Sequence, residues 1–343
     1  MTELIYGMLT GRGVLVPLGA FVIAGALVFA VASRLARHAD AIADATGLGR
    51  VWIGTILLAG STSLPELVTD VNAALLGAID IGVGDLMGST LANMLIFALL
   101  NLAYARRRIL HQVSIDHTLV GALAVALTGI ASAAIASGGW GRIGHVGTET
   151  LLIVALYFFG MRAVYSCTQP TAPPEQLVLG ENSRSLLRRG LAGFAWAAVG
   201  LVVTAPLLVL SAEAVAVESG LSQTFVGTLL VGFTTSFPEI VATIAAVRIG
   251  ALDLAIGNIF GSNAFNMCVL LPMDLAYRQG PVLAHASSAN VLVAQLAILS
   301  LALGMLAVLA RAGRRASIAH IDSVLIVFVY IGSVWLLASG KGG

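Results

Sequence analysis

The chain contains two copies of one segment, and this duplication constrains its fold more than any other feature. The copies span residues 54–94 and 227–267 and align without a gap at a constant offset of 173 residues. They are identical at 17 of 41 positions, including a Pro-Glu pair that ends at Glu66 or Glu239 and a later Gly-Ser pair. A repeated apolar segment that is broken by glycine and proline and carries acids is typical of a binding site at the repeat interface of a membrane transporter.

The composition indicates that most of the chain lies in a lipid bilayer. Hydrophobic residues make up 58% of the sequence, charged residues make up 10%, and 38 residues are glycine. A hydrocarbon core of about 30 Å needs roughly 20 helical residues, and the apolar runs predict ten such spans. These lie at residues 14–34, 51–74, 80–102, 117–137, 148–166, 191–212, 224–247, 252–274, 289–310 and 320–339. The runs lack the polar and apolar alternation of a membrane β-barrel, so the predicted fold is an all-α polytopic membrane bundle.

Basic residues predict the orientation of this bundle, because Lys and Arg near the ends of spans stay on the cytoplasmic side. Of the 18 basic residues, fourteen fall on one side of the ten-span arrangement and four on the other. This distribution places both termini outside and the linker at 167–190 in the cytoplasm. Each half holds five spans, an odd number, so the repeats at 1–166 and 191–343 are predicted to be inverted relative to each other.

The remaining global features argue against several other classes of protein. A net charge of +1 gives no indication of nucleic-acid binding, since membrane topology accounts for the arginines. Cys167 and Cys268 lie in different halves without a metal-binding spacing, and both are predicted to be unpaired thiols. The N-terminus lacks the pattern of a cleaved signal peptide. Its first apolar run is therefore predicted to be a span, and the protein to be a multi-pass protein of the inner (plasma) membrane.

Three of the acids in the repeated segments, Glu66, Asp85 and Glu239, lie inside apolar stretches, where each costs at least about 2.5 kcal/mol. Glu66 and Glu239 occupy the same position in the two copies, whereas Asp85 of the first copy corresponds to Asn258 of the second. The rise of a helix places these side chains at comparable depths in the membrane. We therefore expect all four to converge near its midplane.

Hydroxyl residues beside the two Pro-Glu pairs complete a predicted ion site. They are Thr62, Ser63, Thr235 and Ser236. Proline removes one helical N–H and obstructs the carbonyl a turn earlier, so backbone carbonyls are free to face the site. Carboxylate, amide, hydroxyl and carbonyl oxygens form a hard ligand set that suits Ca²⁺ or, with less charge, Na⁺. The absence of His and Cys from this set argues against a soft transition metal.

Other polar and small residues of the repeats have more ordinary interpretations. Asp70, at i+4 from Glu66, is predicted to lie at an interface or at the mouth of the site, since its counterpart in the second copy is the uncharged Thr243. Asp40 and Glu213, which the same offset relates, are expected to be solvated or capping acids near the ends of the first and sixth spans. Four glycines are equally consistent with the site and with close helix packing; they are Gly84, Gly88, Gly257 and Gly261.

The paired segments resemble the α-1 and α-2 repeats of the cation/calcium antiporter superfamily, and the most similar branch is the prokaryotic sodium/calcium exchanger type. The resemblance rests on Ser61-Thr-Ser-Leu-Pro-Glu66 with Gly84-Asp-Leu-Met-Gly-Ser89, and on Thr234-Thr-Ser-Phe-Pro-Glu239 with Gly257-Asn-Ile-Phe-Gly-Ser262. It extends over nearly the whole chain. It implies a ten-helix fold of two inverted repeats that exports Ca²⁺ in exchange for several Na⁺ while the first and sixth helices slide past a fixed core.

The resemblance also assigns roles to individual residues. Glu66 and Glu239 match the two family glutamates that ligate Ca²⁺ and Na⁺. Asp85 and Asn258 match two positions that vary between Asn and Asp. The neighbouring hydroxyl and carbonyl positions are matched by Thr62, Ser63, Thr235 and Ser236.

The chain departs from the family consensus at a few of these positions. Asp85 replaces an asparagine, which leaves three carboxylates and one amide in the predicted site, and Thr90 replaces the Asn of Gly-Ser-Asn. Potassium-dependent relatives carry Asp where this chain has Asn266, and the proton-coupled branch carries Glu where it has Gly88 and Gly261. The resemblance therefore favours coupling to Na⁺, with H⁺ coupling or another divalent cargo as the alternative.

Electrostatics predict how such a site would operate. Carboxylates in a poorly polarisable medium repel by several kcal/mol per pair, so the site should change sides only when Ca²⁺ or Na⁺ neutralises it. A cation channel, the alternative from another class, would normally present a continuous pore. An enzyme would need a nucleophile with a base, and Ser63 and Ser236 have no candidate His at their depth. We expect no enzymatic activity and no cofactor, Ca²⁺ and Na⁺ as substrates, the bilayer as surroundings and a monomer as the working unit, with an oligomer as the alternative.

Overall fold

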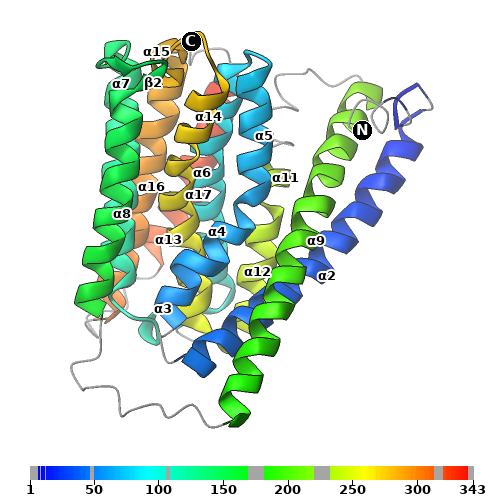
Figure 1. Ribbon diagram of the computed structural model, residues 1–343, viewed down its shortest axis with the longest axis vertical. Coiled ribbons are helices and arrows are strands. Elements are labelled where there is room, and N and C mark those ends of the chain that lie inside the picture. The colour runs from blue at the N-terminus through cyan, green and yellow to red at the C-terminus, as the bar shows by residue number, and fades with distance from the viewer. Residues whose placement is uncertain are drawn as a thin grey trace.

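The computed structural model is a bundle of helices that run in both directions along one long axis (Figure 1). It describes residues 7, 9–11, 13–46, 50–105, 109–168, 181–219, 232–312 and 320–338. Within this part of the chain, seven helical segments are long and apolar enough to cross a membrane, and two shorter apolar helices accompany them. The two-residue strands β1 (Arg142–Ile143) and β2 (Val146–Gly147) pair in a small antiparallel hairpin. The prediction of an all-α multi-span membrane protein is confirmed at this level.

The helices follow the predicted order of spans. In chain order they are α2 (Leu15–Thr46), α3 (Arg50–Trp52), the π-helix η1 (Ile53–Leu58), α4 (Ala59–Thr62), α5 (Leu64–Leu75), α6 (Ile79–Ala103), the 3₁₀-helix η3 (Ile109–His111), α7 (His117–Ser137), α8 (Thr148–Thr168), α9 (Glu181–Ser219), α11 (Gly232–Thr235), α12 (Phe237–Arg248), α13 (Leu252–Cys268), α14 (Leu270–Ala276), α15 (Val282–His285), α16 (Ala289–Ala312) and α17 (Ile321–Ala338). The start of the seventh predicted span, at 224–231, lies outside the described residues.

The first and sixth helices are longer than the predicted spans at 14–34 and 191–212. Helix α2 continues to Thr46 because a buried apolar face, including Leu35, Ala39 and Ile42, continues past the first charged residues at helical spacing. Helix α9 begins at Glu181, inside the segment expected as a linker, and runs for 39 residues. Hydropathy alone predicted spans that are too short, because a hydropathy average falls at charged residues even when the opposite face of the helix is still apolar and buried.

The second and seventh predicted spans are broken helices, as expected. Ser63 separates α4 from α5, and Ser236 separates α11 from α12, with nearly identical backbone angles of −84° and 7° against −79° and 1°. Proline follows within the first turn of the next helix in both cases, at Pro65 and Pro238. Proline is compatible with the first turn of a helix but not with the interior. The break is therefore encoded twice by the same local sequence.

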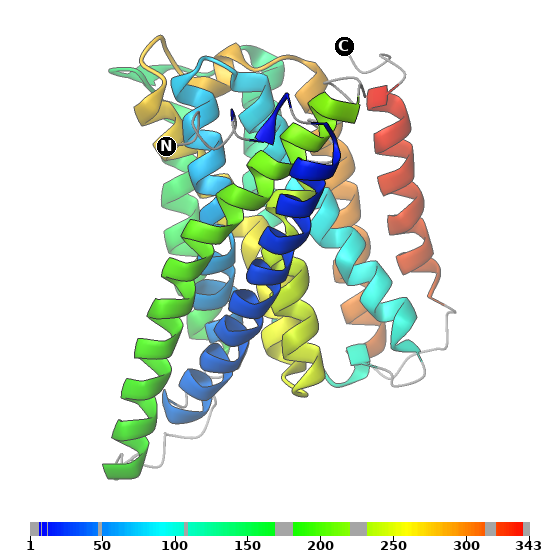
Figure 2. The same ribbon diagram turned by 90° about the vertical axis from the view of Figure 1, so that its right-hand side faces the viewer.

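Each broken helix is followed by a tight turn and a second, highly buried helix. The turns use Gly77 and Gly250, at φ of +75° and +81°, a conformation that glycine adopts without strain. Ala78 N–H donates to the Ala73 carbonyl and Ala251 N–H to the Ala246 carbonyl, both over 2.9 Å. The turn between α5 and α6 lies at the end of the bundle where α2 begins, whereas the turn between α12 and α13 lies at the opposite end (Figures 1 and 2).

Acids at the two hairpin turns hold loops from the other half of the chain. Asp80 accepts a hydrogen bond from the Ser287 N–H over 2.6 Å, and Asp253 accepts one from the Ser114 N–H over 2.7 Å. Each acid also contacts the polar side chain three residues further along its loop. Donors and acceptors of the two sets are related by the same 173-residue offset as the repeats. The internal duplication therefore extends beyond the motif segments to the tertiary contacts.

Helices α2 and α9 form a long tilted pair along one flank of the bundle (Figure 2). Glycine lets their backbones approach. A Cβ on Gly193 would lie 2.3 Å from the His38 ring, and a Cβ on Gly200 would lie 3.2 Å from Val31. Small residues at such positions are the usual means of close packing between membrane helices. The pair packs against the rest of the bundle partly through α12.

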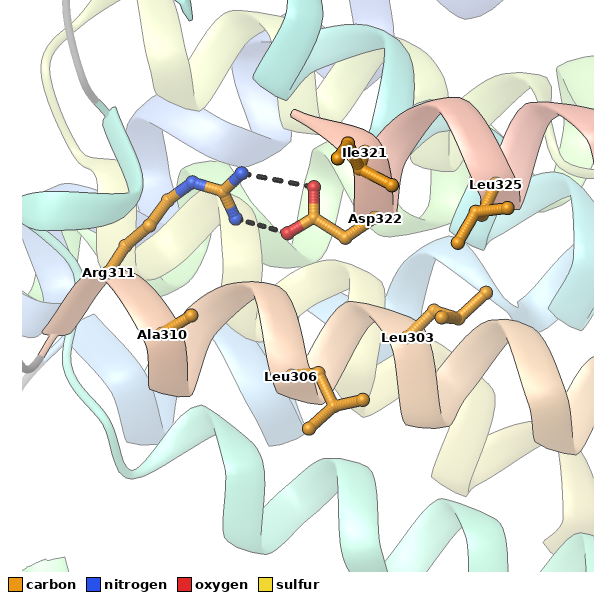
Figure 3. Close-up of a pocket in the computed structure, with 7 residues that line it drawn as sticks. All are labelled: Leu303, Leu306, Ala310, Arg311, Ile321, Asp322 and Leu325. Atoms are coloured by element: carbon orange, nitrogen blue, oxygen red, sulfur yellow. Dashed lines mark hydrogen bonds and ion pairs between the residues drawn. The ribbon is translucent and has the colours of Figure 1, made fainter. Parts of the chain in front are cut away.

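The last two helices are joined by a charged pair near one end of the bundle. The Arg311 guanidinium on α16 binds both carboxylate oxygens of Asp322 on α17, one of them over 3.0 Å (Figure 3). Leu303, Leu306 and Leu325 line an apolar recess beside it. The bidentate pair satisfies the charge of a largely buried arginine.

Helix α13 crosses the π-helical segment at very close range. A Cβ on Gly257 would lie 3.1 Å from the Val51 carbonyl oxygen, and a Cβ on Gly261 would lie 2.4 Å from the Thr55 carbonyl oxygen. These two glycines serve backbone packing, which was one of the two interpretations of the motif glycines. Gly84, by contrast, would meet only the Asn290 side chain, at 3.4 Å.

We predict that Gly261→Ala destabilises the protein by about 1–3 kcal/mol, because the new methyl group would collide with backbone atoms that cannot rotate away. Gly129→Ala is the matched control, since among the described residues no atom lies within 4 Å of a Cβ at that position on α7. Thermal unfolding in detergent should show a lower Tm for Gly261→Ala alone. Equal Tm values for the two variants would contradict this packing.

Candidate ion-binding site

The two helix breaks bring both Pro-Glu pairs into the interior of the bundle. Glu66 lies in the first turn of α5 and Glu239 in the first turn of α12, and both side chains are fully buried. The first turn of a helix favours a negative charge, because its N–H groups are unpaired and its dipole is positive there. The fold thus provides the same partial compensation to both glutamates.

Hydroxyl groups at each break reach across to the other repeat. The Thr62 hydroxyl donates to Asn258 Oδ1 and the Thr235 hydroxyl donates to Asp85 Oδ1, each over 3.2 Å. The four residues form two pairs related by the 173-residue offset. All four are buried. The structure therefore brings the broken helix of each repeat together with the buried helix of the other, which hydropathy alone could not show.

The arrangement around the two glutamates is not symmetric. Ser63 donates its hydroxyl to Glu239 Oε1 over 3.1 Å. Among the described residues, the equivalent Ser236 hydroxyl and both carboxylate oxygens of Glu66 have no hydrogen-bond partner. The eight residues predicted for the site are all buried, and six of them are linked by hydrogen bonds, whereas Glu66 and Ser236 are not.

Several buried carboxylate oxygens of the site lack a partner in the described part of the chain. They are Oε1 and Oε2 of Glu66, Oε2 of Glu239 and Oδ2 of Asp85. The described ion pairs, His117–Asp253 and Arg311–Asp322, involve none of these acids. Buried charge without a partner is strongly unfavourable. The arrangement would be stabilised by a cation that accepts several oxygen ligands.

The site offers neutral oxygens as well as carboxylates. Within the described residues, no three His, Cys, Asp or Glu side chains are grouped as a metal centre. An ion held here would therefore be bound by a mixture of carboxylate, amide, hydroxyl and backbone oxygens. That mixture suits hard cations such as Ca²⁺, which takes six to eight oxygen ligands.

Asp70 was expected at an interface or at the mouth of the site. Its side chain is fully buried on α5, and neither of its carboxylate oxygens has a hydrogen-bond partner among the described residues. The signal for this position was its spacing of four residues from Glu66, which places both on one face of the helix. The uncharged counterpart Thr243 obscured that signal. Thr243 itself accepts a hydrogen bond from Asn258 Nδ2 over 3.0 Å.

Two further polar residues were missed in the core between α6 and α13. Asn93 donates from Nδ2 to Asn263 Oδ1 over 2.9 Å, and both side chains are fully buried. They are the final asparagine of the first Gly-Ser motif and an asparagine directly after the Gly-Ser pair of the second. They crosslink the two buried helices and so hold the two halves of the site in register.

The acids predicted near the ends of the first and sixth spans lie within longer helices. Asp40 is half-buried on α2, which continues to Thr46, so the capping interpretation is wrong for this residue. Glu213 lies on α9, and its side chain is outside the described part of the structure.

Comparisons with known proteins agree with this architecture. CaxA of Alkalimonas amylolytica, which is named as an antiporter, is 29% identical over 322 residues, covering 90% of this chain and 94% of CaxA. The sodium/calcium exchanger MaX1 of Methanosarcina acetivorans is 26% identical over 267 residues, covering 69% of this chain and 76% of MaX1.

Among solved structures, the sodium-calcium exchanger NCX_Mj soaked with 10 mM Na⁺ and zero Ca²⁺ has a similar fold, with a TM-score of 0.70 at 20% sequence identity. The match covers 94% of this chain and 99% of that structure. The family model described as sodium/calcium exchanger protein matches residues 16–166 and 189–338. These segments include both broken helices and both buried helices. The chain belongs to the sodium/calcium exchanger family.

Proposed function

We propose that the protein is a secondary active antiporter that exports Ca²⁺ in exchange for Na⁺. The observation that carries this proposal is the set of buried carboxylate oxygens at the two helix breaks that have no partner among the described residues. Carboxylates inside a membrane are expensive and mark ion pathways. Both repeats contribute them, as expected for a transporter whose site lies at a repeat interface. The family and the names of MaX1 and NCX_Mj support Na⁺ and Ca²⁺ as the ions.

The proposed ligands are the eight residues predicted from the sequence. Glu66 and Glu239 supply the central charges, with Asp85 and Asn258 beside them. Hydroxyl or backbone oxygens come from Thr62, Ser63, Thr235 and Ser236. The hydrogen bonds between repeats support this assignment, because they place the first-repeat ligands against the second-repeat ligands. An ion bound there would contact both repeats at once, so its binding can be coupled to their relative motion.

Mutual repulsion of the carboxylates makes exchange obligatory in this proposal. An empty site would carry the charge of three acids through the membrane interior, at a cost of several kcal/mol for each pair. One Ca²⁺ or several Na⁺ would remove most of that cost. The site therefore changes sides only when loaded, by alternating access. If more positive charge enters as Na⁺ than leaves as Ca²⁺, a potential of 100 mV contributes about 2.3 kcal/mol per charge toward Ca²⁺ export.

The topology that suits this mechanism is ten membrane helices in two inverted repeats, at 1–166 and 191–343, joined by a cytoplasmic linker at 167–190. Turns of the two hairpins at opposite ends of the bundle support the inversion. The α2–α9 pair is the proposed moving element, because it lies along one flank and packs on the remaining helices mainly through the broken helix α12. We further propose that the protein lies in the cell inner membrane with both termini outside and works as a monomer.

Two other functions would use the same residues. Coupling to H⁺, or transport of another divalent cation, would leave the fold and ligands unchanged. A cation channel would conduct without counter-ion, and single-channel currents would identify it. Exchange measurements separate these cases because only an antiporter requires a second ion on the opposite side.

Glu66→Gln and Glu239→Gln should each abolish exchange while leaving a folded protein. Each change removes a ligand charge but keeps the side-chain shape, and loss of an unpaired buried charge does not weaken folding. The assay is ⁴⁵Ca²⁺ uptake into Na⁺-loaded proteoliposomes, with Tm as the folding control. Asp44→Asn, which neutralises an exposed acid on α2, should retain parental uptake. Substantial uptake by either glutamine variant would refute the assigned ligands.

Uptake of ⁴⁵Ca²⁺ should depend on internal Na⁺, should not require K⁺, and should be electrogenic. The grounds are Asn266 and the Gly-Ser pairs at Gly88 and Gly261, together with the family match. The same proteoliposomes loaded in turn with Na⁺, K⁺ or a proton gradient provide the measurement. A K⁺-selective potential, set with valinomycin, should alter the rate. Equal uptake under a proton gradient without Na⁺ would replace Na⁺ by H⁺ as the coupling ion.

A further inference from the structure

The two repeats differ in the hydrogen bonding available to the residue that neighbours each Asp/Asn position of the site. In the second repeat, Asn258 Nδ2 donates to Thr243 Oγ1 over 3.0 Å. In the first repeat, the equivalent residues are Asp85 and Asp70, which lie on the packed helices α6 and α5 and are both buried. An amide and a hydroxyl complete a hydrogen bond by themselves. Two ionised carboxylates present only acceptor oxygens to each other, so either a shared proton or a cation must lie between them.

No such group is supplied by the described part of the protein. Asp70 is 0% exposed, and neither of its carboxylate oxygens has a hydrogen-bond partner among the described residues. Oδ2 of Asp85 is also buried without a partner, whereas Oδ1 receives the Thr235 hydroxyl. The described ion pairs of the chain involve neither aspartate. A buried carboxylate pair of this kind is stable only when a shared proton or a bound cation compensates it.

The hairpin between α5 and α6 packs the helices that carry this pair against each other. A Cβ on Gly82 of α6 would lie 3.5 Å from the Asp70 carbonyl oxygen and 3.6 Å from Cβ of Ala73, so the two helices are in close contact at this level. Asp70 follows Glu66 by one helical turn and faces the same interior. The Asp70 carboxylate therefore lies on the buried side of α5 and is held by packed helices, not by a loop.

We propose that Asp70 is a fourth carboxylate of the ion site and that Asp70 and Asp85 together hold one hard cation, Na⁺ or Ca²⁺, in addition to the ion at Glu66 and Glu239. This inference rests on the proposed function and deepens it. The two repeats then differ in their tasks. The first repeat holds an additional cation, where the second repeat closes the equivalent space with the bond between Asn258 and Thr243. Asp70 becomes a residue that determines how many ions the loaded site carries.

The test is to count bound ions on purified protein in detergent, with ²²Na⁺ and ⁴⁵Ca²⁺ at equilibrium. Asp70→Asn should bind one Na⁺ fewer than the parent or should weaken Ca²⁺ binding by on the order of tenfold, depending on which cation occupies the pair. Asp70→Thr copies the second repeat and allows a hydroxyl to bond Asp85, so it should fold and give the same result. Glu66→Gln, by contrast, should lose the central ion and retain the one held by Asp70 and Asp85.

Ion-dependent thermal shifts provide a second readout, since a ligand that binds only the folded protein raises its Tm. Both Asp70 variants should show a smaller shift than the parent with the ion that occupies the pair. Unchanged ion counts, affinities and shifts in both variants would overturn the inference and leave antiport intact. The same would follow if the variants changed only the pH dependence, which would indicate a shared proton. Failure of the parent protein to bind either ion would instead overturn the proposed function.

Discussion

Buried, uncompensated negative charge is the constraint on which the rest of this structure depends. Glu66, Glu239 and Asp85 are buried in the interior of a bundle whose described basic side chains lie elsewhere or are already paired. A folded protein tolerates this only if the charge is distributed over favourable dipoles or compensated by bound ions. The positions of both glutamates in first helical turns meet the first condition in part. A transported cation bound at the site would meet the second condition. The same buried carboxylates would then explain both why a cation binds and why the protein transports it.

The helix breaks are what make such a site possible within a membrane. A continuous helix satisfies all its backbone groups internally and offers an ion only side chains. At Ser63 and Ser236 the chain leaves helical geometry for one residue, and the proline two residues later has no N–H to donate to a carbonyl of the preceding turn. The exposed polar backbone is tolerated because both breaks are buried in protein, facing the opposite repeat. The same local sequence thus provides the polar groups that could bind an ion and requires them to be covered by the opposite repeat.

Glycine has a separate role at the two main helix interfaces. At Gly257 and Gly261 it brings α13 against the backbone of the π-helical segment, which positions Asn258 beside the first break. At Gly193 and Gly200 it brings α9 against α2. The first interface involves backbone atoms that cannot yield, whereas the second involves side chains that can change rotamer. This difference is consistent with a fixed core and a mobile flanking pair.

The sequence by itself determined the membrane environment, the helical architecture, the duplication and the breaks at the two Pro-Glu pairs. It did so because hydropathy, proline chemistry and repeat offset are properties of the chain and do not depend on which helices become neighbours. It also supplied the eight candidate ligands, since intramembrane acids and their flanking hydroxyls are local features. Tertiary structure decided which residues of one repeat contact which residues of the other, as in the hydrogen bonds from Thr62 to Asn258 and from Thr235 to Asp85. It also decided the burial of Asp70. The spacing from Glu66 places Asp70 on the same face of its helix, but only the packing of the hairpin against the rest of the bundle decides whether that face is buried.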